Sequence, residues 1–355
     1  MIDTKNCDWL LENADAPIRY RVTRELLNDE EAAKKIEPEL LDNPTVKLWV
    51  SNIRPEWTTH GCNDSYLENS VPKSIQLGLH CGIPQVNNAI KHYVDNFKND
   101  CCEMPHRKNF AGILNSNLVS MIGISDELVL KFMINSLDEM YNFTKQGIYD
   151  IYISDEEKSK LKGIPPRWKN NKFIKPEILS EYGFGYPLIY DILGLYILYD
   201  LKDSEITKKI DNVIAYISAD EFHSKIADGY GILIAGQYDS GNYKYHGMGW
   251  DPKYPGWFDI ADYIENINAP RLLFLTLYFS KYPVARKTDW FKNLLLYLEK
   301  YITENNTYIF SKEWIKEKPG YAVQGSHLSF GENRKKKNWF EIESTFYMQL
   351  LKQNI

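Results

Sequence analysis

The sequence has no long apolar run and no excess of positive charge. No stretch approaches the roughly 18 uncharged apolar residues of a membrane-spanning helix. The opening MIDTKNCDWLLENADAP also lacks the cationic start and uninterrupted apolar stretch of a secretion signal. We therefore expect a soluble, cytoplasmic protein without a membrane span. The formal net charge of −6 is spread along the chain, which argues against nucleic acid as a partner.

Cysteine and the common catalytic motifs are also scarce. The chain has 355 residues but only five cysteines, an odd number, so we expect reduced thiols and no disulfide framework. There is no Gly-rich phosphate loop, no Ser nucleophile elbow and no His-Glu-x-x-His pair. These absences argue against nucleotide hydrolysis, serine hydrolysis and zincin chemistry.

Helical periodicity is what the sequence does contain, and it predicts an all-α protein. One-sided helices include SEITKKIDNVIAYIS, which is entered through Asp203 or Ser204 as its cap, and APIRYRVTRELL, which begins at Pro17. Other segments are apolar on every side, such as YPLIYDILGLYILY from Tyr186 and PRLLFLTLYF from Pro270, and must be surrounded by other helices.

The two kinds of helix alternate along the chain, with a period of roughly 44 residues. Inner and outer helices that alternate in this way predict a single α/α toroid domain over 1–355, with an open superhelical stack as the competing arrangement. The segment 1–55 forms its N-terminal helices, and 144–183 and 218–268 are long insertions rich in Gly, Pro, Tyr and Trp. We expect these insertions to cover one end of the toroid.

A stretch rich in cysteine and histidine raises the question of zinc. Its members are Cys62, Cys81, Cys101, Cys102, His60, His80, His92 and His106. No two of its thiols have Cys-x-x-Cys spacing, so the pattern favours ordinary buried thiols and surface imidazoles, with zinc as the alternative.

The same stretch predicts one wall of a substrate site. A helix that begins near Asp64, capped by that residue or by Asn63, would open at a mouth of the toroid and place His60, Asp64 and Tyr66 where a ligand enters. A capped turn without a ligand is the alternative.

The insertion 218–268 predicts the other wall. His246 with Asp251 could form an acid–base pair, and Asp259 and Asp262 are spaced to share a helix face. The predicted substrate-binding aromatic residues of this region are Trp250, Tyr254, Trp257 and Tyr263. The alternative is that the aromatic residues only seal the end of the toroid. In the C-terminal helix, Glu343 lies near the apolar boundary and is a candidate inward-facing acid.

Several of these segments resemble one superfamily. WLLENADAPIRYRVTRELL, GFGYPLIYDILGLYILYDL and the repeated helix pairs look like the squalene-cyclase-like group of the terpenoid cyclase and protein prenyltransferase superfamily, over about two-thirds of the chain. The resemblance implies an α/α toroid. The Asp-x-Asp-Asp and Asp-Asp-x-x-Asp motifs of its cyclases are missing, and no residue matches the zinc ligands of its prenyltransferases.

Three functions follow as hypotheses. The first is an enzyme that acts on an apolar or prenyl-type small molecule in an aromatic-lined cavity, by acid–base or cation-stabilising chemistry. The second is a carbohydrate-active lyase or glycoside hydrolase, and the third is a non-catalytic helical protein that binds a ligand or partner. An open cleft with carboxylates favours sugars, whereas a closed apolar cavity favours isoprenoids.

Overall fold

The computed structural model is mostly helical, as the periodicity predicts. It describes residues 2–53, 59–103, 110–175, 178, 185, 187–226, 232–237, 243–248, 259–315 and 317–354. The α-helices are α1 (Thr4–Asn13), α2 (Ala16–Arg21), α3 (Glu30–Asp42), α4 (Pro44–Asn52), α5 (Leu67–Gln76), α6 (Pro84–Glu103), α7 (Phe110–Met121), α8 (Glu127–Thr144), α9 (Asp155–Ser159), α11 (Ile189–Gly194), α12 (Ser204–Ile217), α13 (Asp220–Lys225), α14 (Ile260–Asp262), α15 (Ala269–Phe279), α16 (Pro283–Arg286), α17 (Asp289–Leu298) and α18 (Trp339–Gln353).

Shorter helical turns join or extend these helices. The π-helical turns are η1 (Val22–Leu26) and η5 (Tyr263–Asn268). The 3₁₀ turns are η2 (Pro166–Trp168), η3 (Leu195–Leu201), η6 (Glu299–Tyr301), η7 (Lys312–Trp314) and η8 (Ala322–Gln324). In the described part of the chain, no helix combines the length and the apolar character needed to cross a membrane.

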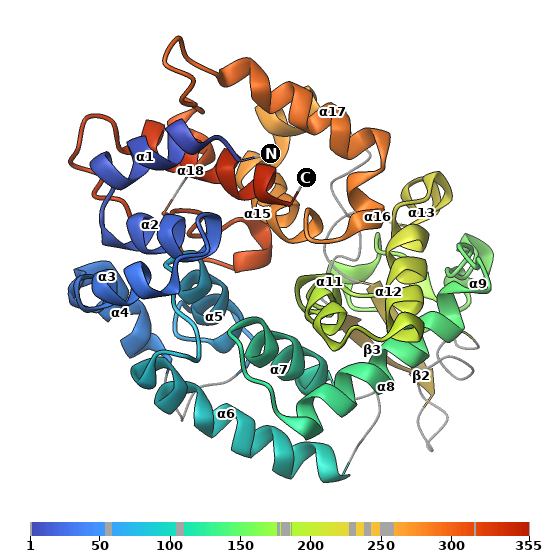
Figure 1. Cartoon of the computed structure of the whole chain (residues 1–355). Coiled ribbons are helices and arrows are strands. Elements are labelled where there is room, and N and C mark those ends of the chain that lie inside the picture. The colour runs from blue at the N-terminus through green and yellow to red at the C-terminus, as the bar shows by residue number, and fades with distance from the viewer. Residues whose placement is uncertain are drawn as a thin grey trace.

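Burial separates inner from outer helices. In α15 every residue except Pro270 and Leu277 is buried, whereas α3 buries only Ala33 and Leu40. Figure 1 shows α5, α7, α11, α15 and α18 toward the middle of the molecule, with α3, α6, α8, α12 and α17 outside them. In chain order α5 contacts α7, α7 contacts α11 and α11 contacts α15. The helices that the sequence marks as apolar on every side therefore form the centre of the core.

A small sheet departs from the all-α prediction. Strand β1 (Phe173–Ile174) pairs in parallel with β2 (Ile232–Gln237), and β2 pairs with β3 (Tyr243–Met248) in an antiparallel ladder that sets Ile232 opposite Met248. The segments ILIAGQ and YKYHGM contain β-branched and aromatic residues and are separated by Tyr-Asp-Ser-Gly-Asn. This pattern is a hairpin signal that the helical interpretation of the chain overlooks.

The start of α5 also differs from the prediction. The helix begins at Leu67 rather than near Asp64, and its N-cap residue Tyr66 makes no side-chain cap. Asn63 instead accepts hydrogen bonds from the backbone N–H and the hydroxyl of Ser65, at 3.1 and 2.6 Å. The Asp64 carboxylate contacts the ring of His327 at 2.8 Å and does not cap the helix.

Gly325 is required by a close approach of two backbones. It has a φ of +80°, and a Cβ there would lie 2.3 Å from the Pro270 carbonyl carbon and the Arg271 nitrogen at the start of α15. Backbone atoms cannot give way as a flexible side chain can. We expect Gly325→Ala to lower the free energy of unfolding in urea by at least about 2 kcal/mol.

Gly147→Ala is the matched control for Gly325→Ala. Gly147 also has a left-handed φ, +64°, but nothing lies within 4 Å of its Cβ position. Gly147→Ala should therefore lose only the stability that a left-handed backbone costs a residue with a Cβ, about 1 kcal/mol. Equal losses of stability in the two variants would contradict the overlap at Gly325.

Candidate functional site

The segment before α5 is held in place by one buried amide. Asn69 of α5 is 1% exposed, and its Nδ2 donates to the carbonyl oxygens of Gly61 and Asn63, at 2.8 and 2.9 Å. Its Oδ1 accepts from the backbone N–H of Ala322 at 2.9 Å. Asn69 thus fixes both the approach to α5 and the turn η8 that packs on it, and so positions the side chains of 60–66.

His60 and a buried carboxylate form the first part of the site. Glu68 is 2% exposed and accepts from His60 Nδ1 at 3.1 Å, from the Gly61 backbone N–H and from the Tyr190 hydroxyl of α11. Burial, followed by the charge of Glu68, raises the pKa of Tyr190 well above its usual value, so this hydroxyl stays a donor. The ring of His60 also lies 5.9 Å from that of Tyr321.

Asp64 belongs to a second group, which is centred on His327. The two ring nitrogens of His327 each contact a carboxylate oxygen at 2.8 Å, Nε2 with Asp64 Oδ1 and Nδ1 with Glu317 Oε2. Two acceptors satisfy both nitrogens only when each carries a hydrogen. Burial of the ring lowers the pKa of His327. The hydrogen bond and charge of Glu317, followed by those of Asp64, outweigh this effect and raise it. The imidazole is therefore held as its cation.

A buried lysine anchors the far side of this group. Lys73 of α5 is 1% exposed, and its Nζ lies 2.6 Å from Glu317 Oε1, 2.9 Å from Ser329 Oγ, and 3.0 and 2.8 Å from the carbonyl oxygens of His327 and Ser329. The Ser329 hydroxyl also bonds Glu317. Although burial opposes ionisation, Lys73 and the other donors hold the pKa of Glu317 far below its usual range.

The backbone of His327 is strained. Its φ is +56°, which is uncommon for a residue other than glycine. Such a conformation persists only where surrounding contacts overdetermine it, and these residues gather at functional sites. Here the two carboxylates, the bond from Lys73 to its carbonyl and the edge-on ring of Trp49, 4.8 Å from its ring centre, supply those contacts.

The group opens onto a cleft of about 990 Å³. Among the residues that line it are Asp15, Glu39, Asp42, Asp64, Glu317 and Glu332, with Arg334 and His327 as the cationic groups. Of the cations that pair with these carboxylates, Arg19, Lys47, Lys73 and Lys336 do not line the cleft. A ligand would therefore meet several carboxylates, although the side chain of Glu332 is itself buried. Asp64 is 34% exposed at its side chain, and its second oxygen accepts no hydrogen bond from a described residue.

The other sequence-predicted residues fall into two sets. Asp259 caps α14 by accepting from the Asp262 backbone N–H at 2.8 Å, and Asp262 accepts from Asn266 at 2.7 Å, both at the exposed surface. Tyr263 is buried and its hydroxyl accepts from Arg271 at 3.4 Å. His246 lies on β3 opposite Ile234. The remaining predicted residues, Trp250, Asp251, Tyr254 and Trp257, lie outside the described residues.

Sequence reasoning missed most of the site. Glu68, Lys73, Glu317, His327, Ser329 and Tyr190 were not among the candidates. One signal was present for Lys73, because the segment from Leu67 can be interpreted as an inner helix of the alternating pattern, and a lysine in an inner helix needs a buried partner. The partner itself could not be named, because Glu317 and His327 lie in a stretch without periodicity.

The described residues contain no group of three or more His, Cys, Asp or Glu side chains arranged to hold a metal. In the Asp64–His327–Glu317 group both imidazole nitrogens already face a carboxylate. Of the cysteines for which zinc binding was the alternative, Cys62 is exposed and Cys81 half-buried. The side chains of Cys101 and Cys102, and all of His106, lie outside the described part of the chain.

The arrangement can do acid–base chemistry without a metal. The carboxylate of Asp64, with one free oxygen, and the protonated imidazole of His327 lie together at an open cleft. His327 holds Asp64 in place, and Glu317, which is bonded to Lys73, holds His327. Comparison of the chain with models of known protein families, with curated proteins and with solved structures finds no match.

Proposed function

We propose that this chain is an enzyme whose helices close into an α/α toroid, and that it carries out acid–base chemistry on a hydroxyl-rich, uncharged or cationic small molecule at the cleft beside Asp64. The succession of contacts from α5 through α7 and α11 to α15 supports the toroid. This proposal adopts the second of the three hypotheses from the sequence, a carbohydrate-active lyase or glycoside hydrolase.

The observation that carries this proposal is the clamped imidazole. His327 is held as a cation in a strained backbone conformation, and the carboxylate on its cleft side keeps one oxygen free. In the proposed role, that Asp64 oxygen takes a proton from a substrate hydroxyl or from water. The His327 cation stabilises negative charge that develops beside it, and Glu317 and Lys73 act as positioning residues.

The charge of the cleft selects among substrates. A surface rich in carboxylates disfavours uronate polymers and diphosphate esters and favours neutral or amino sugars. The polar lining also fits an open sugar site better than a closed isoprenoid cavity. A prenyl-type substrate remains a prediction for a cavity lined by the aromatic residues of 218–268, most of which lie outside the described residues.

The test is a substrate panel with matched variants. The purified chain is incubated with neutral glycosides, amino-sugar glycosides, uronate polysaccharides and isoprenoid diphosphates, and products are measured by mass spectrometry. We expect turnover of a neutral or amino-sugar glycoside, and a loss of about 100-fold or more in Asp64→Asn. His327→Gln should also lose activity and shift the pH profile.

Asp42→Asn is the control for Asp64→Asn, because Asp42 lines the same cleft but pairs with the exposed Lys47. It should keep nearly full activity. Turnover confined to an isoprenoid diphosphate, or full activity in Asp64→Asn, would refute the proposal.

A further inference from the structure

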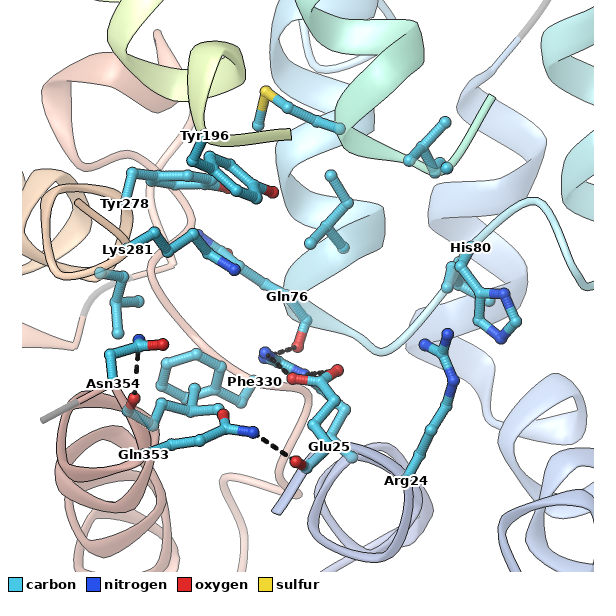
Figure 2. Close-up of a pocket in the computed structure, with 18 residues that line it drawn as sticks. Arg24, Glu25, Gln76, His80, Tyr196, Tyr278, Lys281, Phe330, Gln353 and Asn354 are labelled. Carbon is cyan, nitrogen blue, oxygen red and sulfur yellow. Dashed lines mark hydrogen bonds and ion pairs between the residues drawn. The ribbon is translucent and has the colours of Figure 1, made fainter. Parts of the chain in front are cut away.

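A second cavity lies at the other end of α5. It has a volume of about 250 Å³ and gathers residues from the C-terminal ends of α5, α7, α15 and α18. Figure 2 shows Gln76, Tyr196, Tyr278, Lys281 and Phe330 around it. Asp64 precedes the first turn of α5 and Gln76 ends the helix, so this cavity is separate from the acidic cleft.

One of the residues that line this cavity carries an unpartnered, buried oxygen. Gln76 is 4% exposed, and its side-chain Oε1 has no hydrogen-bond partner, although its backbone carbonyl accepts from Arg21 Nη1 at 3.0 Å. Buried polar atoms are nearly always paired, and an unpaired one costs about 1–3 kcal/mol. The hydroxyls of Tyr196 and Tyr278 on the same wall bond to no described residue either. The walls of the cavity therefore carry polar groups that have no hydrogen-bond partner among the described residues.

Lys281 is an exposed cation on the wall of the cavity, and its charge, after that of Arg21, lowers the pKa of Glu25 on the same wall against the effect of burial. Its Nζ lies 4.4 Å from the ring centre of Tyr196, and it has no ion pair among the described residues. Arg21 is paired with Glu25 through both Nε and Nη2, at 2.8 and 2.7 Å. Arg24 is paired with Glu30 at 3.2 Å.

His80 adds no positive charge to this wall. Its Nδ1 accepts from the Gly82 N–H at 3.0 Å, which leaves Nε2 to donate to the Tyr20 hydroxyl at 2.9 Å. Burial, followed by the nearby Arg24, lowers the pKa of His80 and keeps it neutral. Lys281, which makes no direct ion pair with a described residue, is therefore the cation left for a ligand.

We infer that this cavity binds a small monocarboxylate that has an apolar body and an N–H or O–H donor, of about the size of an amino acid or a 2-hydroxy acid. The carboxylate pairs with Lys281, the donor bonds Gln76 Oε1, and the body packs on Ile75, Leu79 and Phe330. The volume lies just below the usual range for drug-sized ligands, which fits a metabolite of this size. The inference does not depend on the chemistry proposed for the cleft.

The test measures thermal unfolding and calorimetric binding with apolar amino acids, apolar 2-hydroxy acids and inorganic phosphate as probes. We expect at least one monocarboxylate to raise the unfolding temperature of the wild-type chain, and Lys281→Met to weaken its affinity at least tenfold. Lys300→Met is the matched control, because Lys300 also lies over a tyrosine ring, 5.0 Å from that of Tyr297, but does not line the cavity. It should bind as wild type does.

Gln76→Leu distinguishes an effect on ligand binding from an effect on the stability of the fold. Because it removes an unpaired buried polar group, it should leave the unfolding temperature without ligand unchanged or higher, yet lose the response to the monocarboxylate. Asp64→Asn should bind normally. The inference is overturned if no monocarboxylate stabilises the wild type, if phosphate does so equally well, or if the Lys281 and Lys300 variants bind alike.

Discussion

Replacing Lys73 with methionine is expected to lower the free energy of unfolding by about 3–5 kcal/mol, because it removes the buried cation from the part-buried carboxylate of Glu317, which keeps only His327. Methionine fills a similar volume, so the loss reports on charge and hydrogen bonds and not on packing. Glu317 Oε1 loses its charged donor and keeps the Ser329 hydroxyl, and the His327 carbonyl keeps the Ser329 backbone N–H, whereas the Ser329 carbonyl loses the one donor that it has among the described residues. Urea denaturation followed by circular dichroism measures the change.

Two further variants show how the Lys73→Met result should be interpreted. Lys292→Met breaks an exposed pair with Asp289, whose side chains are 58% and 93% exposed, and should cost less than about 0.5 kcal/mol. The double variant Lys73→Met, Glu317→Gln should recover part of the loss, because the stranded charge is gone. A single-variant loss as small as that of Lys292→Met would show that Lys73 does not hold the site together.

Glu343 is expected to make the stability of the protein fall as pH rises. Its side chain is fully buried, its Oε1 accepts from the backbone N–H groups of Phe330 and Glu332 at 3.0 and 3.1 Å, and its Oε2 has no partner. Burial raises its pKa to about 8, against the opposing charges of Lys73 and Arg334. The acid is therefore protonated in the folded protein at neutral pH.

The sign of the effect follows from proton counts. Between the unfolded pKa, 4.5, and the folded value of about 8, the folded chain binds more protons than the unfolded chain. The contribution of Glu343 is thus greatest below pH 4.5 and declines by about 1.4 kcal/mol per pH unit, or about 5 kcal/mol in total, up to pH 8. His327 has a raised pKa and acts in the same direction, but only above its unfolded value of 6.5.

Glu343→Gln tests this account. Measured as the difference from wild type between pH 4.5 and 6.5, where His327 contributes little, the variant should remove the Glu343 slope, because glutamine keeps the accepting oxygen and does not titrate. Glu341→Gln is the control on the same helix, since Glu341 is half-buried and bonded to Thr307 at 2.6 Å. Parallel pH profiles for wild type and Glu343→Gln would contradict a neutral buried acid.

Much of the helical layer could be predicted because its signals are local. Asp203 caps α12 and Pro17 lies in the first turn of α2, as the sequence predicts, and the burial of Glu343 follows from its place at the apolar edge of its helix. The hairpin of β2 and β3 was missed although its signal is also local. The strand signal of its residues was given less weight than the helical periodicity of the segments around it.

By itself, the sequence determined that this chain is mostly helical and which helices lie at the centre, and it singled out the stretch around His60 and Asp64 as a candidate site. Only the tertiary structure decided what those residues contact. Asp64 meets His327 across 263 positions and Lys73 meets Glu317 across 244. Periodicity and capping act within a few turns of one helix, whereas ion pairs at such separations depend on how the helices pack, and no local pattern encodes that.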